Sequence, residues 1–175
     1  MSVWGRTAVV GVYEHPARFA PNLTAYQIHA ESARGALADA GLTVGDVDGF
    51  CTSGVGPIGI LSLAGHLNLR PRWLDSQAIG GSSFVSHCLH AAAAIAAGLC
   101  EVVLVTYGST AASERFAIGT GGGAGMDPPD AFEAPFGPTI VGSYALVAQR
   151  HMHEFGTTSE QLAEIAVTAR RHAGL

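Results

Sequence analysis

Lysine is absent from this sequence, and all nine of its basic residues are arginines. Without lysine the chain offers no Schiff-base amine, no anchor for pyridoxal phosphate and no Walker lysine for a nucleotide. Charge of either sign is also scarce: only 13% of the 175 residues are charged, and the formal net charge is −5. This composition excludes the clustered cations that a nucleic-acid partner requires.

Long apolar runs and paired cysteines are missing too. The apolar run near the N-terminus is too short for a signal peptide, and Glu101 interrupts the longest candidate for a membrane span. Cys51, Cys88 and Cys100 have no CxxC spacing and leave one cysteine over, which is typical of a reducing compartment. We therefore expect a cytoplasmic protein with no membrane span. Because only 13% of the residues are charged and 48% are hydrophobic, we also expect an extensive subunit interface, and hence a homodimer.

Apolar runs and turn residues alternate along the first 110 residues. They predict a buried strand at Thr7–Val12, a helix from Thr24 to Gly41, and a helix at Ser82–Ala97 that ends at Gly98. Further strands are expected within 46–54, 72–80 and 100–108, with a short helix at 61–67. This alternation predicts an α/β layered fold with a largely buried sheet.

The character of the sequence changes after residue 110. A glycine- and proline-rich stretch, 119–138, cannot form a regular element, and it lacks the strand and helix that a phosphate-binding glycine motif requires. Two helices then meet at Phe155–Gly156, and Thr158 with Gln161 forms a capping-box pattern. We predict an α/β core at 1–110 and a second segment at 111–175. The chain stops directly after a helix, so we expect it to be truncated.

The stretch Gly80–Ser83 precedes the alanine-rich helix, where a strand ends and a helix begins. Ligands bind at such points in α/β proteins, and the first N–H groups of a helix favour negative charge. The alternative is that these small residues only permit close helix packing. Ser82 and Cys88 are the candidate nucleophiles, although Cys88 lies two turns into the helix, where a thiol normally acts as a small hydrophobe. His87 and His90 share a face, but no carboxylate completes a metal motif, so we expect no metal.

Two stretches resemble one known family. "GGSSFVSHCLHAAAAIAAGLCEVVLVTYGST" resembles the nucleophile helix of the thiolase superfamily and the strand behind it, and "VGSYALVAQRHMHEFGTTSEQLAEIAVTARRHAGL" resembles the helix pair of its loop domain. The sequence is most similar to the N-terminal half of the sterol-carrier-protein-x and bacterial lipid-transfer-protein thiolases. This resemblance implies a thiolase-like α/β/α fold and a coenzyme A thioester as substrate, with no covalently bound cofactor.

The departure from the family lies at its acylated cysteine, whose position corresponds to Gly81. Glycine cannot carry an acyl group, so the resemblance shifts to the lipid-transfer-type aldolases, which cleave β-hydroxyacyl-CoA thioesters by a retro-aldol route. Those enzymes pair with a small OB-fold protein of the DUF35 type, which makes such a partner an expectation here. Retro-aldol cleavage needs a base and a stabilised enolate but no acyl acceptor. The base is not assignable within these residues.

The leading hypothesis is therefore a thiolase-like retro-aldol lyase. Its substrate-binding residues would be Gly80, Gly81, Ser82, Ser83, Thr139, Gly142 and Tyr144, and the loop 119–138 would border the entrance for coenzyme A. One alternative is a true acyltransferase that carries the acyl group on Ser82 or Cys88. The other alternative is a non-catalytic subunit that binds lipid or acts as a scaffold.

Overall fold

A computed structural model describes residue 3 and residues 5–53, 59–114 and 140–175 of the chain. The chain divides into two compact units, 1–116 and 117–175. No helix of the described residues is long and apolar enough to cross a membrane.

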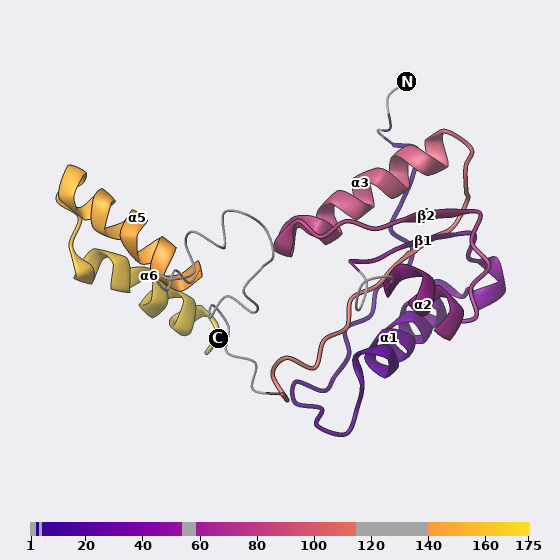
Figure 1. The fold of residues 1–175 in the computed structure, drawn as a ribbon, viewed down its shortest axis with the longest axis horizontal. Coiled ribbons are helices and arrows are strands. Elements are labelled where there is room, and N and C mark those ends of the chain that lie inside the picture. Colours follow the sequence, from indigo (N-terminus) through magenta and orange to yellow (C-terminus); the bar gives the residue numbers. More distant parts are fainter. Residues whose placement is uncertain (1–2, 4, 54–58, 115–139) are drawn as a thin grey trace, which may run out of the picture. The chain divides into compact units, whose positions relative to one another are not determined.

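The first unit is built on three short parallel strands (Figure 1). They are β1 (Gly49–Cys51), β2 (Trp73–Asp75) and β3 (Val103–Val105), in the order β2-β1-β3. Phe50 of β1 is in register with Leu74 of β2 and with Leu104 of β3. The three strands lie within the segments that the sequence predicts, and their parallel pairing follows from the helical connections between them.

Helices cover both faces of this sheet. In Figure 1, α1 (Ala25–Ala40) and α2 (Gly59–His66) lie on one side and α3 (Ser83–Ala96) lies on the other. Phe50 and Leu104 share one hydrophobic core with Leu37 of α1 and Leu63 of α2, and Phe50 and Leu63 are completely buried. Because strand side chains alternate between faces, the neighbours of Phe50 and Leu104 point toward α3. The predicted α/β layered fold is confirmed.

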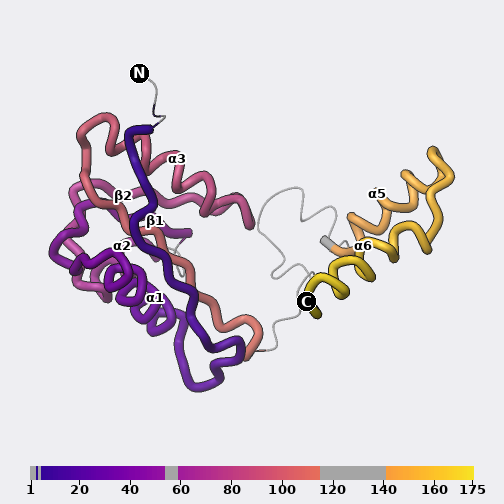
Figure 2. The backbone as a smooth tube through the Cα atoms, turned by 180° about the vertical axis from the view of Figure 1, so that it is seen from behind, coloured from indigo at the N-terminus to yellow at the C-terminus, as the bar shows by residue number. Residues whose placement is uncertain are grey.

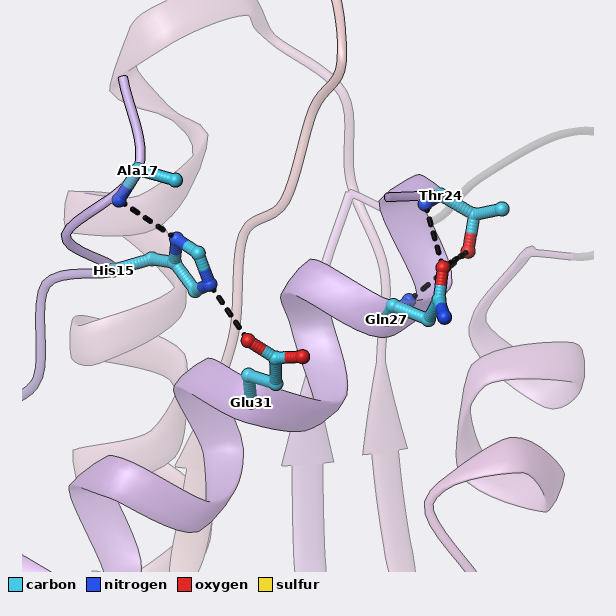
Figure 3. Close-up of polar contacts among 5 residues, drawn as sticks. All are labelled: His15, Ala17, Thr24, Gln27 and Glu31. Atoms are coloured by element: carbon cyan, nitrogen blue, oxygen red, sulfur yellow. Dashed lines mark hydrogen bonds and ion pairs between the residues drawn. The ribbon is translucent and has the colours of Figure 1, made fainter. Parts of the chain in front are cut away.

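Local signals set the ends of α1. The Thr24 hydroxyl accepts from the Gln27 N–H at 3.2 Å, and the Gln27 side-chain oxygen accepts from the Thr24 N–H at 2.8 Å (Figure 3). At the other end Gly41 has a φ of 68°, a left-handed conformation that glycine adopts without steric cost. The predicted boundaries of this helix are therefore confirmed. A 3₁₀ turn, Val44–Asp46, then leads toward β1.

The predicted strand at Thr7–Val12 is wrong. These residues form no strand, and Val9, Val10 and Val12 are 77%, 66% and 72% exposed. The segment, the indigo tube in Figure 2, instead follows α1: a Cβ on Gly11 would lie 2.3 Å from the Ala36 carbonyl oxygen. A β-branched run favours extended backbone, but a strand forms only against a partner strand. None of the three strands of the described chain pairs with this segment.

Polar contacts tether the same N-terminal segment to α1. The Val12 N–H donates to the Asp39 carboxylate at 2.9 Å. His15 Nδ1 accepts from the Ala17 N–H at 3.1 Å, and its Nε2 lies 2.8 Å from the Glu31 carboxylate (Figure 3). A backbone N–H can only donate, so the proton of the ring lies on Nε2 and points to Glu31.

The second unit contains two helices among its described residues, α5 (Ile140–Phe155) and α6 (Ser159–His172). Gly156 between them has a φ of 67°, and the Thr158–Gln161 capping box is formed at the start of α6. This pair of helices and its turn are confirmed as the sequence predicts them. Residues 119–138, expected to be a loop, lie outside the described residues.

Candidate functional site

The segment between β2 and α3 carries the candidate site. After β2 ends at Asp75, residues 76–79 form no regular element; a 3₁₀ turn follows at Gly80–Ser82, and the chain enters α3 at Ser83. Gly80 has a φ of +76°, where any other residue would be strained. At Gly81 a Cβ would meet no atom within 4 Å, so the space beside this residue is open. Gly80 thus shapes the turn, and Gly81 leaves room next to the start of the helix.

The two serines of this turn have different environments. Ser83 is 1% exposed. Its hydroxyl accepts from the Ile79 N–H at 2.9 Å and donates to the Gly80 carbonyl at 2.7 Å. Ser82 is exposed, forms no side-chain capping bond and belongs to the 3₁₀ turn rather than to the predicted helix. Ser83 therefore holds the turn together, whereas Ser82 faces outward beside Gly81.

Cys88 lies outside the buried, sheet-facing side of α3. Ser83, His87, Ala91 and Ala94 are the buried residues of this helix. Cys88 is one position past this stripe and is exposed. The sequence predicts a thiol that packs as a small hydrophobe, but the structure places it outside the described core. Helix periodicity is the reason, because only every third or fourth residue meets the sheet.

The other two thiols are unreactive by environment. Cys51 and Cys100 are 0% and 1% exposed. Burial, assisted by the nearby Asp75 carboxylate, raises the pKa of Cys51 to about 12. Burial also raises the pKa of Cys100 above its ordinary value. Neither forms the thiolate that nucleophilic chemistry needs at neutral pH.

Two aromatic residues beside the start of α3 were not singled out from the sequence. The rings of Phe84 and Tyr107 pack at 5.0 Å between centroids, and Phe84 also meets the ring of His87 at 5.9 Å. Tyr107 is 62% exposed and comes two residues after β3 ends. The signal that could have identified Tyr107 is its place after a parallel strand, because those strand ends gather at one edge of the sheet.

His90 and His87 lie on neighbouring turns of α3 but have different partners. His90 Nδ1 lies 2.6 Å from the Asp75 carboxylate at the end of β2. His87 is completely buried, and its Nε2 accepts from the Gln77 N–H at 3.3 Å. Within the described ranges, no group of three or more histidine, cysteine or acidic side chains is placed to hold a metal ion.

The remaining predicted site residues lie in the second unit. Gly142 and Tyr144 are in the first half of α5, and the Tyr144 side chain is 72% exposed. Thr139 lies outside the described residues. A contribution of these three residues to the site at Gly80–Ser83 stays a prediction. A separate cavity of about 190 Å³ lies in the first unit between α1, α2 and β3, and Gly80–Ser83 do not line it.

Comparison with known proteins gives this site a context. No protein-family model matches the chain. The chain is 32% identical over 154 residues to a "Steroid side-chain-cleaving aldolase" of Thermomonospora curvata, covering 84% of the chain and 39% of that protein. It is 30% identical over 181 aligned residues to the "17-hydroxy-3-oxo-4-pregnene-20-carboxyl-CoA lyase" of Mycobacterium tuberculosis, covering 97% of the chain and 46% of that protein. The chain thus spans less than half the length of these relatives.

A solved structure is similar over nearly the same span. The "Ltp2-ChsH2(DUF35) aldolase" matches with a TM-score of 0.74 and 29% identity, over 95% of the chain and 43% of that protein. The similarity therefore extends to the fold. Together these comparisons show that the chain is similar to parts of proteins that are named as aldolases and as a CoA lyase.

Proposed function

We propose that this chain is part of a thiolase-like acyl-CoA lyase that cleaves a carbon–carbon bond by a retro-aldol reaction. The observation that carries the proposal is the similarity to an aldolase and to a CoA lyase, at 32% and 30% identity. The glycine before α3 supports it, because position 81, which the family resemblance aligns with the acylated cysteine, carries no side chain and has open space beside it.

The proposed reaction needs no acyl acceptor. A base removes the proton of the β-hydroxyl group, and the oxygen lone pair forms the new carbonyl as the Cα–Cβ bond breaks. The electron pair of that bond moves into the thioester and gives an enolate, which is then protonated at Cα. Because the thioester itself accepts the electrons, catalysis has to stabilise a developing oxyanion and supply a base. The proposal assigns that base to none of the residues that the structure describes.

The residues around Gly81 would bind the thioester end of the substrate. Gly80 and Gly81 leave the backbone accessible, Ser82 is exposed beside them, and Ser83 holds the turn. The first N–H groups of α3 would favour negative charge that develops near them. Thr139, Gly142 and Tyr144 are proposed as a second lining of this site, and residues 119–138 as the border of the coenzyme A entrance.

Partners are part of the same proposal. One similar structure is named as an aldolase with a DUF35 protein, so we propose a DUF35-type OB-fold partner for this chain. We also propose a homodimer, because apolar side chains of the first unit such as Val85, Leu89 and Leu99 are at least half exposed. Sedimentation velocity with and without a DUF35-type protein measures both, and a lone monomer in both runs would contradict both assignments.

Placing a thiol at position 81 tests the site directly. The variant Gly81→Cys, made with Cys88→Ser to remove the exposed native thiol, is incubated with acetyl-CoA, and acylation is followed by peptide mass spectrometry. Gly65→Cys in the same background is the matched control, because a Cβ at Gly65 also meets no atom within 4 Å. We expect acyl transfer to Cys at position 81 to be at least about tenfold faster than transfer to Cys at position 65, because even modest positioning of two reactants gives such a gain. Equal rates at the two positions would contradict the proposed binding site.

A product assay separates the reaction classes. With a β-hydroxyacyl-CoA and a DUF35-type partner present, retro-aldol cleavage yields a ketone or aldehyde together with a shortened acyl-CoA. An acyl adduct on Ser82 or Cys88 of the unmodified chain would instead support the acyltransferase alternative. Acyl-CoA binding without any product in the assembled complex would favour the non-catalytic subunit.

A further inference from the structure

His87 connects α3 to the turn that presents the glycines. Its side chain is 0% exposed and lies in the second turn of the helix. Its Nε2 accepts a hydrogen bond from the backbone N–H of Gln77 at 3.3 Å. Gln77 lies between the end of β2 and Gly80, so this bond spans the segment that determines where Gly80 and Gly81 are held.

The partner of Nε2 fixes the protonation state of the ring. A backbone N–H can only donate, so Nε2 must be unprotonated and the single proton of the neutral ring lies on Nδ1. Nδ1 is buried and has no hydrogen-bond partner among the described residues. A second proton would turn Nε2 into a donor that faces another donor, so protonating His87 breaks its bond with Gln77.

Neighbouring groups act on the same ring. Burial lowers the pKa of His87 below its ordinary value, the Asp75 carboxylate on β2 opposes this effect, and His90 on α3 adds to it. Asp75 is already engaged with His90 at 2.6 Å. Beyond β3, the ring of Tyr107 contacts Phe84, which also contacts the ring of His87. The neutral ring is therefore the form that fits its surroundings.

We propose that His87 is a positioning residue. Its neutral imidazole holds the turn between β2 and α3 through the hydrogen bond from Gln77, here called the latch, and protonation of the ring breaks this bond. In the latched form Gly80 and Gly81 are held at the start of α3. In the released form Gln77 loses its acceptor and the turn moves away from the helix. The consequence for ligand binding rests on the proposed function, whereas the latch itself does not.

Amide hydrogen exchange tests the latch without any ligand. The exchange rate of the Gln77 amide is followed by NMR between pH 7.5 and 4.5 and corrected for intrinsic exchange. The Leu99 amide, just past the C-terminal end of α3 and bonded to the Ala94 carbonyl, is the internal reference. In the unmodified chain we expect the protection of Gln77 to fall roughly fivefold to tenfold as His87 is protonated, the worth of one hydrogen bond. His87→Gln supplies an acceptor that does not titrate, so its protection should stay high and constant. His87→Phe has a ring but no acceptor, so its protection should be low throughout.

Two results of the exchange experiment would contradict the latch. Protection of Gln77 that does not change with pH in the unmodified chain would overturn the proposal. So would a His87→Gln variant that loses protection over the same pH range. His90→Gln is the matched control on the neighbouring turn of α3. Protection of Gln77 should still fall as the pH is lowered in this variant, with a shifted midpoint because His90 acts on the pKa of His87.

Binding of acetyl-CoA, measured by calorimetry against coenzyme A alone, then tests the consequence. We expect affinity to fall several-fold from pH 7.5 to 5 in the unmodified chain and to stay level in His87→Gln, relative to the coenzyme A reference. That reference is needed because phosphate groups titrate near pH 6. Absent binding with the expected exchange pattern would reject the proposed function and keep the latch. Binding without the exchange pattern would reject the latch and keep the proposed function.

Discussion

The stability of the first unit should depend on pH through His29. This histidine of α1 is 1% exposed, and its Nδ1 lies 2.8 Å from the Thr106 hydroxyl just after β3. The Thr106 carbonyl in turn accepts from the Thr52 hydroxyl at 3.0 Å, so the network joins α1 to the ends of β1 and β3. Burial lowers the pKa of His29 from 6.5 to about 4, and a hydrogen bond with the Gly108 backbone opposes this shift only in part.

The sign of the effect follows from which state binds the proton. Above pH 6.5 the His29 ring is neutral in both the folded and the unfolded chain, so the free energy of unfolding has its full value. Between pH 6.5 and 4 the unfolded chain binds a proton that the folded chain excludes, so the free energy of unfolding falls as the pH is lowered. At about 1.4 kcal/mol for each pH unit between the two pKa values, the loss reaches about 3 kcal/mol at pH 4. That is a large share of the roughly 5–15 kcal/mol by which a typical domain is stable.

Tryptophan fluorescence in urea measures this effect in one unit only, because Trp4 and Trp73 both precede residue 117. His29→Gln keeps a hydrogen-bonding side chain but does not titrate, so its stability should change less between pH 7 and 4.5. His172→Gln, at an exposed position of α6, is the control and should keep the full pH dependence. A free energy of unfolding that is level from pH 7 to 4.5 would refute the reasoning. So would equal slopes in His29→Gln and the unmodified chain.

Further predictions concern thiols, glycines and a helix cap. At pH 8 a disulfide reagent should label Cys88 rapidly and Cys51 only as the chain unfolds, because Cys51 is buried and its pKa is raised to about 12; rapid reaction of Cys51, followed by mass spectrometry, would contradict this. Gly81→Ala should change the free energy of unfolding by less than about 0.5 kcal/mol, whereas Gly49→Ala should cost about 1–3 kcal/mol, because its Cβ would lie 2.7 Å from a Val103 methyl group. Equal urea midpoints for the two variants would refute this distinction. Thr158→Ala removes the capping box of α6 and should cost about 1 kcal/mol of helix stability, seen as faster amide exchange in the first turn.

The structural surroundings of the candidate site could be predicted in part from the sequence. The place of Gly80–Ser83 between a strand and a helix could be predicted, because turn residues and a long uncharged run are local signals. The different environments of Ser82 and Ser83 could not be predicted, since they depend on which hydroxyl accepts from the Ile79 N–H. From the sequence His87 stands out only because it shares a helix face with His90, and its contact with Gln77 becomes visible only once α3 is packed on the sheet.

By itself the sequence determined the elements that local interactions define. These elements are the capping boxes at Thr24 and Thr158 and the left-handed glycines at 41 and 156. Each depends on groups only a few residues apart, so no distant contact is needed to form it. The tertiary structure decided that Thr7–Val12 form no strand and that the Cys88 thiol is exposed. It also decided the burial of His29 beside Thr106, 77 residues away. Those outcomes depend on partners far along the chain, and a residue's type and local spacing do not say which distant group will lie against it.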